Sequence, residues 1–298
     1  NLSQKGVISV NIDNSLTKTT TCDKKSSATK AQKPTMIVEI GKAKALFNES
    51  KALQKKMFAD AQQGKALSLD PVVEVTNKTI DAIFDNASAL ACVINIRKKD
   101  EYLLEHSVSV SVLITIFARF LAISRDIVEQ LAVGAFLHDV GKIMIPEAIL
   151  NKPSKLTDDE FTLVKTHVNH SINIIEKTPN ISAISLEIAA LHHEKLDGNG
   201  YPHQVKGDNI SQYGRMIAIC DIFDALIANR SYKQGFSHPK AFGILRNLAL
   251  KNHLDSHLVD SFIKCMGVYP IGSLVELSSN KLAIVEAVNE QNPTKPKV

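Results

Sequence analysis

The chain has 298 residues, of which 44% are hydrophobic and 22% charged, and its formal net charge is +4. This length is ample for a sizeable core, and it allows either about two domains or one larger helical domain with short appendages. Because the net charge is small and the lysines at positions 24, 25, 30 and 33 lie in a polar stretch, we expect no concentrated nucleic-acid-binding face and no nucleic-acid polymer as a partner.

Residues 1–37 are expected to be the remnant of an N-terminal domain plus a linker. Residues 6–12 alternate apolar and polar side chains, which is typical of a strand, and residues 12–36 are rich in Thr, Ser, Lys and Asp. The chain begins with Asn1 rather than methionine, so we expect it to be a fragment of a longer protein.

Helical spacing of apolar residues dominates the next part of the chain. The helices predicted from this spacing cover residues 39–63, 71–93, 100–122, 125–138, 158–176, 181–193, 212–229, 239–251 and 256–266. The longest apolar stretch, residues 108–123, is interrupted by polar residues and is shorter than a membrane span requires, so we expect no membrane association. Two apolar runs, at 274–277 and 282–285, flank Ser-Ser-Asn-Lys and predict a small C-terminal β-hairpin.

The four cysteines, Cys22, Cys92, Cys220 and Cys265, stand far apart and form no C-x-x-C pair. This spacing fits reduced thiols, so we expect a cytoplasmic protein in which no cysteine binds a metal. Histidines and carboxylates are therefore the metal-binding candidates.

Two residue pairs are the strongest of these candidates. His192 and His193 are adjacent and end an apolar segment, and the earlier pair His138 and Asp139 closes a predicted helix. A single histidine on an apolar stripe is usually a hydrogen-bonded core residue, whereas several histidines accompanied by carboxylates favour a metal site, because imidazole is a frequent metal ligand. We interpret both pairs as parts of one site.

Four more residues extend this set. His106 ends the apolar stripe of its predicted helix, and Asp221 lies in an otherwise apolar helix, where a buried carboxylate needs a partner such as a metal. His167 and His170 lie one turn apart on the same helix face, and we expect only one of them to be a ligand.

Glycines and other histidines surround these motifs. Gly141 is expected to stop the helix that ends at the His-Asp pair, and Gly198 and Gly200 are expected to allow turn conformations closed to other residues. His203 and His238 fall in predicted loops and are expected to stay outside the metal site.

Three long motifs occur along the chain in a fixed order. They are LHDVGKIMIPEAILNKP at residues 137–153, HHEKLDGNGYP at residues 192–202 and DIFDALIANRSYK at residues 221–233. Together they resemble the HD-GYP phosphodiesterases of bacterial cyclic-dinucleotide signalling. The resemblance spans residues 98–270 as a catalytic domain, with N-terminal helices at 38–97 and a C-terminal hairpin and tail at 271–298. It implies a mainly α fold, an HD-type helical bundle with the small hairpin appended.

The resemblance also implies a ligand set for two divalent transition-metal ions. One ion would be held by His106, His138, Asp139 and Asp221, and the second by Asp139, His167, His192 and His193, with Asp139 bridging. The family usually has glycine at the position of Ser171. In the family pattern, the place of His167 before that position selects it over His170. Iron or manganese is the family expectation, and nickel or zinc also suits mixed nitrogen and oxygen donors.

Some family members bind a third ion through a glutamate one turn before the equivalent of His106. This chain has Tyr102 at that position, and a neutral phenol is a poor substitute for a carboxylate. We therefore predict a site for two ions.

By the same resemblance, Asp139 and Lys142 are the catalytic residues, with Lys142 approaching the scissile phosphate. Arg230 and Lys233 would bind phosphate oxygens, and Tyr201 would shape the nucleotide site. The expected reaction opens a 3′,3′-cyclic dinucleotide, cyclic di-GMP or cyclic GMP-AMP, to a linear 5′-phosphorylated dinucleotide. Overall resemblance to the members that prefer cyclic GMP-AMP favours the hybrid molecule.

Three alternatives stay open. A non-catalytic cyclic-dinucleotide sensor would be expected to lack a ligand or the Gly-Tyr-Pro turn, and this chain has both. A generic HD-domain nucleotide phosphohydrolase would lack the block at residues 192–202. A scaffold that uses an intact site only for structure is compatible with the sequence, as is a homodimer.

Overall fold

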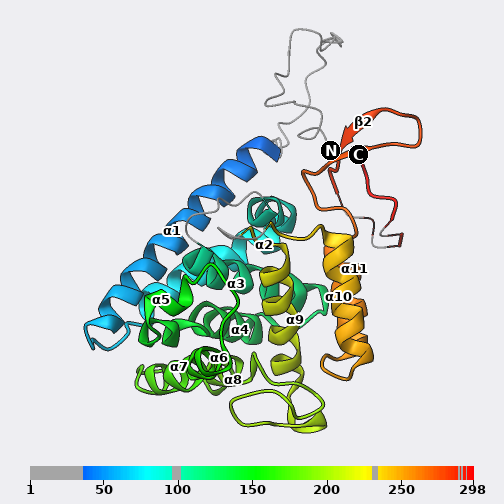
Figure 1. The fold of residues 1–298 in the computed structure, drawn as a ribbon. Coiled ribbons are helices and arrows are strands. Elements are labelled where there is room, and N and C mark those ends of the chain that lie inside the picture. The colour runs from blue at the N-terminus through cyan, green and yellow to red at the C-terminus, as the bar shows by residue number, and fades with distance from the viewer. Residues whose placement is uncertain (1–35, 96–101, 230–233, 288, 290, 293) are drawn as a thin grey trace, which may run out of the picture. The chain divides into compact units, whose positions relative to one another are not determined.

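Helices form most of the protein in the computed structural model, which describes residues 36–95, 102–229, 234–287, 289, 291–292 and 294–298 (Figure 1). The elements are α1 (Met36–Gln62), α2 (Asp70–Asn95), α3 (Tyr102–Phe120), α4 (Arg125–Leu137), the 3-10 helix η4 (Val140–Met144), α5 (Glu147–Leu150), α6 (Asp158–Lys165), α7 (His167–Glu176), α8 (Ala183–Leu191), the 3-10 helix η5 (Gly207–Asn209), α9 (Gln212–Ile227), α10 (His238–Leu250), α11 (Ser256–Met266), β1 (Leu274–Glu276) and β2 (Leu282–Ile284). The expected mainly α class is confirmed. The strand predicted at residues 6–12 lies outside the described residues.

Helix α3 is the central element of the bundle. It packs against α1, α2, α4, α9 and α11, and every residue from Glu105 to Ala118 is buried. A helix that is apolar all round is stable when other helices surround it. The long apolar run is therefore core, and no helix among the described residues is long and apolar enough to cross a membrane.

Four phenylalanines join α3, α9, α10 and α11. The ring of Phe262 meets Phe117 and Phe223 edge to face, with centroids 5.2 and 5.0 Å apart, and Phe242 stacks on Phe223 at 5.3 Å. Such aromatic pairs add about 0.5–1.5 kcal/mol each beyond the area they bury. Helices α10 and α11 are thus fixed to α3, which carries His106, and to α9, which carries Asp221.

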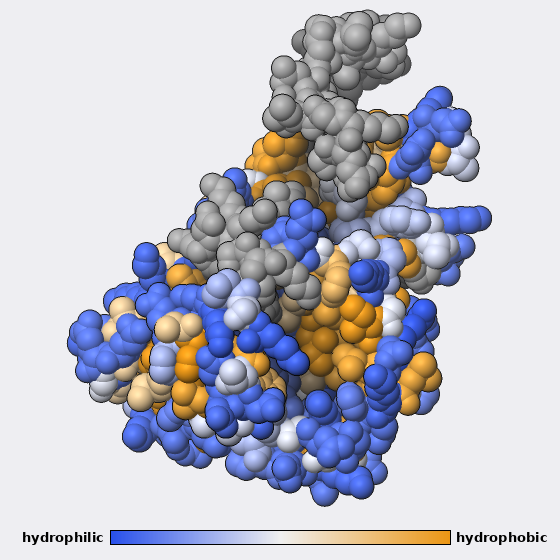
Figure 2. Space-filling model, in the orientation of Figure 1, coloured by the Kyte–Doolittle hydropathy of each residue, from blue (hydrophilic) through white to orange (hydrophobic). Residues whose placement is uncertain are grey.

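On the face shown in Figure 2, a hydrophobic area lies over α9 and α10 between hydrophilic side chains.

The helix expected over residues 158–176 is divided in two, which corrects that prediction. α6 begins at a capping box made by Thr157 and Glu160 and ends at Thr166. The hydroxyl of Thr166 donates to the carbonyl of Leu163 at 2.7 Å, and its N–H also bonds Leu163. A side chain that competes for helix carbonyls favours such a break. As a consequence, His167 opens a new helix, α7.

The C-terminal hairpin is confirmed. β1 and β2 pair antiparallel, with Leu274 opposite Ile284 and Glu276 opposite Leu282. The other long predicted helices are present with boundaries shifted by a few residues, whereas the short helices η4, α5 and η5 were not expected.

Candidate metal centre

The two oxygens of the Asp139 carboxylate face two different pairs of imidazoles. Oδ2 lies 3.5 Å from Nε2 of His106 and 3.4 Å from Nε2 of His138. Oδ1 lies 3.3 Å from Nε2 of His167 and 3.9 Å from Nε2 of His192. Asp139 is fully buried, so it stands between two groups of nitrogen atoms as a bridging carboxylate would.

Three histidines of the cluster use Nδ1 in the same way. Each donates Nδ1–H to the carbonyl three residues earlier: His138 to Ala135 at 2.6 Å, His167 to Val164 at 2.6 Å and His192 to Ala189 at 2.8 Å. The last carbonyls of a helix lack partners within the helix, and each of these histidines follows the end of α4, α6 or α8. This arrangement fixes the tautomer and directs three Nε2 lone pairs into the cluster.

His106 is oriented by a carboxylate instead. Its Nδ1 lies 2.8 Å from Oδ2 of Asp224, and its Nε2 lies 2.9 Å from Oδ1 of Asp221. Asp224 is fully buried on α9, one turn after Asp221. A carboxylate behind a histidine is a common way to orient a metal ligand, and Asp224 was missed in the sequence because only its partner on α3 reveals the role.

His193 and Tyr201 lie at the more exposed edge of the cluster. Nδ1 of His193 lies 3.6 Å from Oδ2 of Asp221, and 25% of the His193 side chain is exposed. The ring of Tyr201 lies 4.7 Å from that of His193, tilted by 35°. The backbone N–H of Tyr201 donates to the backbone carbonyl of His193 at 3.2 Å. Burial raises the pKa of Tyr201 well above its usual range. Tyr201 is therefore a neutral phenol beside the cluster.

The glycine-rich turn after the histidine pair is held by Glu194. Its buried carboxylate accepts from the N–H of His203 at 2.7 Å and from that of Val205 at 3.1 Å. A Cβ at position 200 would lie 2.5 Å from Cα of Glu194, so only Gly200 permits this close approach. Gly198 has a φ of +82°, which confirms the turn conformation expected there.

Gly141 does not stop α4 but allows η4 to pack on α7, which corrects the prediction for this residue. A Cβ there would lie 2.1 Å from the carbonyl oxygen of His167 and 2.8 Å from Cβ of His170. The N–H of Gly141 donates to the hydroxyl of Ser171 at 2.8 Å. The contact brings the His-Asp pair against the start of α7, with His167 in the cluster and His170 outside it.

Burial and charge set the protonation of the cluster. Burial alone would raise the pKa of Asp139, but Lys142 and the neighbouring imidazoles of His138 and His167 hold it well below its usual range. Burial disfavours a charged His106, yet its hydrogen bonds to the two aspartates on α9 raise its pKa to about 9. Burial lowers the pKa of His193 to about 3. The cluster therefore combines ionised carboxylates with mostly neutral imidazoles, the forms that bind metals.

Several atoms of the cluster are well matched to a cation. Nε2 of His167 and Nε2 of His192 are 3.3 Å apart, and both are acceptors because each ring donates through Nδ1. Nε2 of His138 and Oδ1 of Asp139 are buried without a hydrogen-bond partner among the described residues. Two groups can each hold an ion: His106, His138 and Asp139, and His167, His192 and His193. Lone pairs that face one another are stabilised by a cation between them.

A family model described as HD domain matches residues 92–258. The chain belongs to the HD-domain family. A cyclic di-GMP phosphodiesterase of Pseudomonas aeruginosa is 34% identical over 260 residues, which cover 87% of this chain and 62% of the relative. A 3′3′-cGAMP-specific phosphodiesterase of Vibrio cholerae is 49% identical over 98 residues, 33% of this chain and 19% of that protein. The chain therefore spans less than two thirds of these relatives.

The resemblance to HD-GYP phosphodiesterases is confirmed by these relatives. The fold is also similar to that of an HDG"Y"P protein from Bdellovibrio bacteriovorus, with a TM-score of 0.63, 18% identity and coverage of 79% of this chain and 73% of that one.

The structure brings together all seven candidate ligands predicted from the sequence, together with Lys142 and Tyr201. Arg230 and Lys233 lie outside the described residues, and so does the side chain of Tyr102. His203 is exposed on a loop as expected. His238 stays outside the cluster, but it is buried at the start of α10 rather than placed in a loop, which corrects that prediction.

Proposed function

We propose that this HD domain is a metal-dependent phosphodiesterase that hydrolyses a 3′,3′-cyclic dinucleotide, cyclic di-GMP or cyclic GMP-AMP, to a linear 5′-phosphorylated dinucleotide. The observation that carries the proposal is the placement of Asp139, whose two oxygens face separate imidazole pairs. The names of the relatives support the class of substrate, since they act on cyclic di-GMP or on 3′3′-cGAMP.

Two divalent ions, with iron or manganese preferred, would be held by the ligand set already given. His106, His138 and Asp221 would serve one ion and His167, His192 and His193 the other, with Asp139 shared. Ions held in this way supply a deprotonated water as nucleophile and positive charge that stabilises the phosphoryl oxygens.

Among the described residues, Lys142 is a cation well placed to assist. Its Nζ lies 2.5 Å from Oδ2 of Asp139, and 17% of its side chain is exposed. It keeps Asp139 ionised, and its remaining N–H groups can donate to a phosphoryl oxygen of a substrate that reaches the cluster. Arg230 and Lys233 are proposed to bind further phosphate oxygens.

At the exposed edge, the neutral phenol of Tyr201 contributes an apolar ring beside His193 and one hydroxyl donor. In this proposal Tyr201 lines the part of the site through which the sugar and base of the bound substrate extend away from the cluster. The Glu194 carboxylate keeps the turn that carries Tyr201 in position through its two backbone hydrogen bonds. A cytoplasmic location, expected from the separated cysteines, is part of the proposal.

A product assay tests the proposal directly. Protein loaded with iron or manganese is incubated with cyclic di-GMP, cyclic GMP-AMP or cyclic di-AMP under identical conditions, and Asp139→Asn is the inactive control. Appearance of a linear 5′-phosphorylated dinucleotide from one of the first two supports the proposal. Tight binding without any product would instead identify a sensor, and hydrolysis of mononucleotides alone would identify a generic phosphohydrolase.

A further inference from the structure

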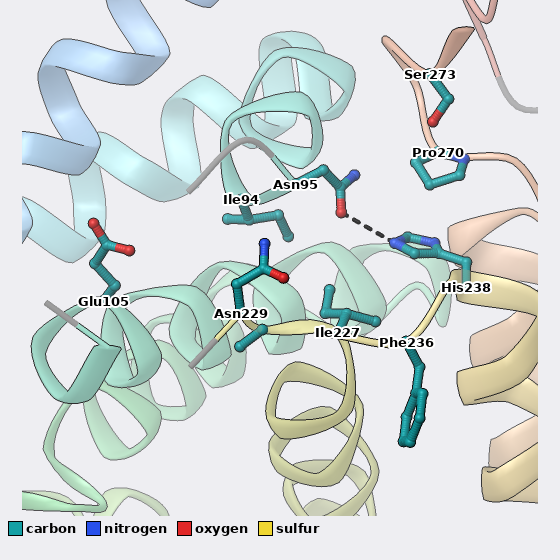
Figure 3. Close-up of a pocket in the computed structure, with 10 residues that line it drawn as sticks. Ile94, Asn95, Glu105, Ile227, Asn229, Phe236, His238, Pro270 and Ser273 are labelled. Atoms are coloured by element: carbon teal, nitrogen blue, oxygen red, sulfur yellow. Dashed lines mark hydrogen bonds between the residues drawn. The ribbon is translucent and has the colours of Figure 1, made fainter. Parts of the chain in front are cut away.

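A cavity outside the histidine cluster lies where the end of α2, the start of α3 and the segment after α9 meet (Figure 3). Its volume is about 180 Å³, and none of its lining residues is a candidate metal ligand. A single buried water needs about 10–15 Å³, so the cavity is roughly ten times larger than the space of one water molecule. The cavity therefore has room for a bicyclic ring but not for a whole cyclic dinucleotide.

His238 lines this cavity, and one of its ring nitrogens has no hydrogen-bond partner in the part of the chain that the structure describes. The amide nitrogen of Asn95 donates to the carbonyl of Ala91 at 2.8 Å, so its oxygen faces His238 and accepts from Nε2 at 3.1 Å. Burial lowers the pKa of His238 to about 4, so the ring is neutral and carries one proton, on Nε2. Nδ1 is then an acceptor, and it has no hydrogen-bond partner among the described residues.

This acceptor is open to a donor from a ligand. His238 is only 7% exposed, and a buried acceptor without a donor is destabilising. In Figure 3 its second ring nitrogen lies on the side of Pro270 and Ser273. A group with an N–H that enters between these residues would satisfy it.

Other groups of the cavity suit a flat heterocycle. The side-chain oxygen of Asn229 accepts from the N–H of Gly235 at 3.0 Å, which leaves its Nδ2 to donate, and Figure 3 shows Nδ2 directed toward Ile94. Ile94 and Ile227 supply apolar surface. The cavity thus offers an acceptor, a donor and apolar walls, which is the pattern that a nucleobase edge and its faces require.

The lining residues that the structure describes favour an N–H donor over a phosphate. Glu105 is part of the lining, and its carboxylate lies 3.4 Å from Nζ of Lys51. Nδ1 of His238 accepts an N–H donor and has no proton to give to a phosphate oxygen. The base of a nucleotide fits this environment better than its phosphate does.

The cavity also lies at a suitable separation from the metal centre. Glu105 directly precedes His106, and Ala228 follows Asp221 by seven residues, or about 10 Å along α9. This is comparable to the length of one nucleotide. We infer that the cavity is a subsite for one purine base of the cyclic dinucleotide, with a base N–H donating to Nδ1 of His238. The inference rests on the proposed function for the identity of the ligand.

Two substitutions of His238 distinguish the role of its Nε2 donor from that of its Nδ1 acceptor. His238→Gln keeps a donor near the position of Nε2 but has no acceptor at the position of Nδ1, whereas His238→Asn keeps an acceptor near Nδ1 and loses the bond to Asn95. In metal-loaded protein, we expect His238→Gln to raise KM for cyclic di-GMP about tenfold with little change in kcat, and His238→Asn to have a smaller effect. The exposed residue His257 provides the control variant His257→Ala, with unchanged KM.

A phosphodiester without a base gives the second readout. KM for bis(p-nitrophenyl) phosphate should stay the same in all three variants, because this substrate has no base to place in the cavity. Equal rises in KM for cyclic di-GMP in the Gln and Asn variants, or a matching rise for bis(p-nitrophenyl) phosphate, would overturn the base subsite.

Calorimetric titration with GMP separates the two proposals. If wild-type protein hydrolyses neither diester but His238→Gln still weakens GMP binding about tenfold, the subsite stands and the phosphodiesterase proposal fails. If cyclic di-GMP is hydrolysed and neither KM nor the Kd for GMP changes in His238→Gln, the phosphodiesterase proposal stands and the subsite is wrong.

Discussion

Oδ2 of Asp224 lies 2.8 Å from Nδ1 of His106, and the Nε2 atom on the other side of the same ring lies 2.9 Å from Oδ1 of Asp221. One face of α9 thus supplies both a candidate ligand and the carboxylate that orients another candidate ligand. Since the two aspartates are one turn apart and His106 comes from α3, the pair also joins two helices in the core.

Asp224→Asn should weaken metal binding without removing a ligand. The amide can no longer enforce the His106 tautomer through a charged acceptor, so metal affinity or activity is expected to fall about 10- to 100-fold. Metal content after dialysis against a chelator series measures the effect. Asp260→Asn is the matched control, because Asp260 is exposed and forms a surface ion pair with Arg246. Equal metal retention in both variants would contradict an orienting role.

Local sequence signals were sufficient for most of the long helices and for singling out the adjacent pairs His138-Asp139 and His192-His193. They did not reveal the break at Thr166 or the short helices. The roles of Asp224 and Gly141 could not be predicted, because they depend on contacts with residues far away in the chain. Asp224 meets a histidine 118 residues earlier, and Gly141 touches the backbone of α7. The burial of His238 escaped prediction for the same reason, since it follows from the packing of Phe223 and Phe242 around its ring.

Asp139→Asn should abolish hydrolysis and reduce bound metal. An amide keeps the size of the side chain but cannot bridge two cations, and the loss of several kcal/mol of charge stabilisation corresponds to a rate at least about 100-fold lower. His193→Ala should act in the same direction. Turnover and elemental analysis are measured together, with His203→Ala as a control in an exposed loop. Near-normal activity and metal content in Asp139→Asn would show that the site is assigned wrongly.

Metal binding at pH 7 should release about one proton, most of it from His106. In the metal-free cluster the pKa of His106 is raised to about 9, so this ring is protonated at pH 7 and must lose its proton when Nε2 binds a cation. Calorimetry in buffers of different ionisation enthalpy counts the protons. The release should fall as the pH rises through about 9. A count near zero at pH 7 would place the metal away from His106.

Gly141→Ala should destabilise the fold, whereas Gly243→Ala should not. A Cβ at position 141 would lie 2.1 Å from the carbonyl oxygen of His167, so the backbone must shift, at a cost of about 1–3 kcal/mol or more. Position 243 on α10 has no atom within 4 Å of such a Cβ, and alanine there is expected to stabilise the helix by up to about 1 kcal/mol. Urea unfolding of both variants checks the contrast. Similar midpoints would mean that η4 and α7 are less tightly packed than described.

His238 should make the protein less stable in mild acid. Its pKa falls to about 4 in the folded state because burial disfavours the charged ring, whereas an unfolded histidine titrates near 6.5. Between these values the unfolded chain binds more protons than the folded one, so stability is complete above about pH 6.5 and is lost as the pH falls toward 4. The shift corresponds to about 3 kcal/mol. Because glutamine does not titrate, the free energy of unfolding of wild type should fall relative to that of His238→Gln as the pH is lowered from 7 to 4. A constant difference across that range would show that His238 does not titrate with a lowered pKa.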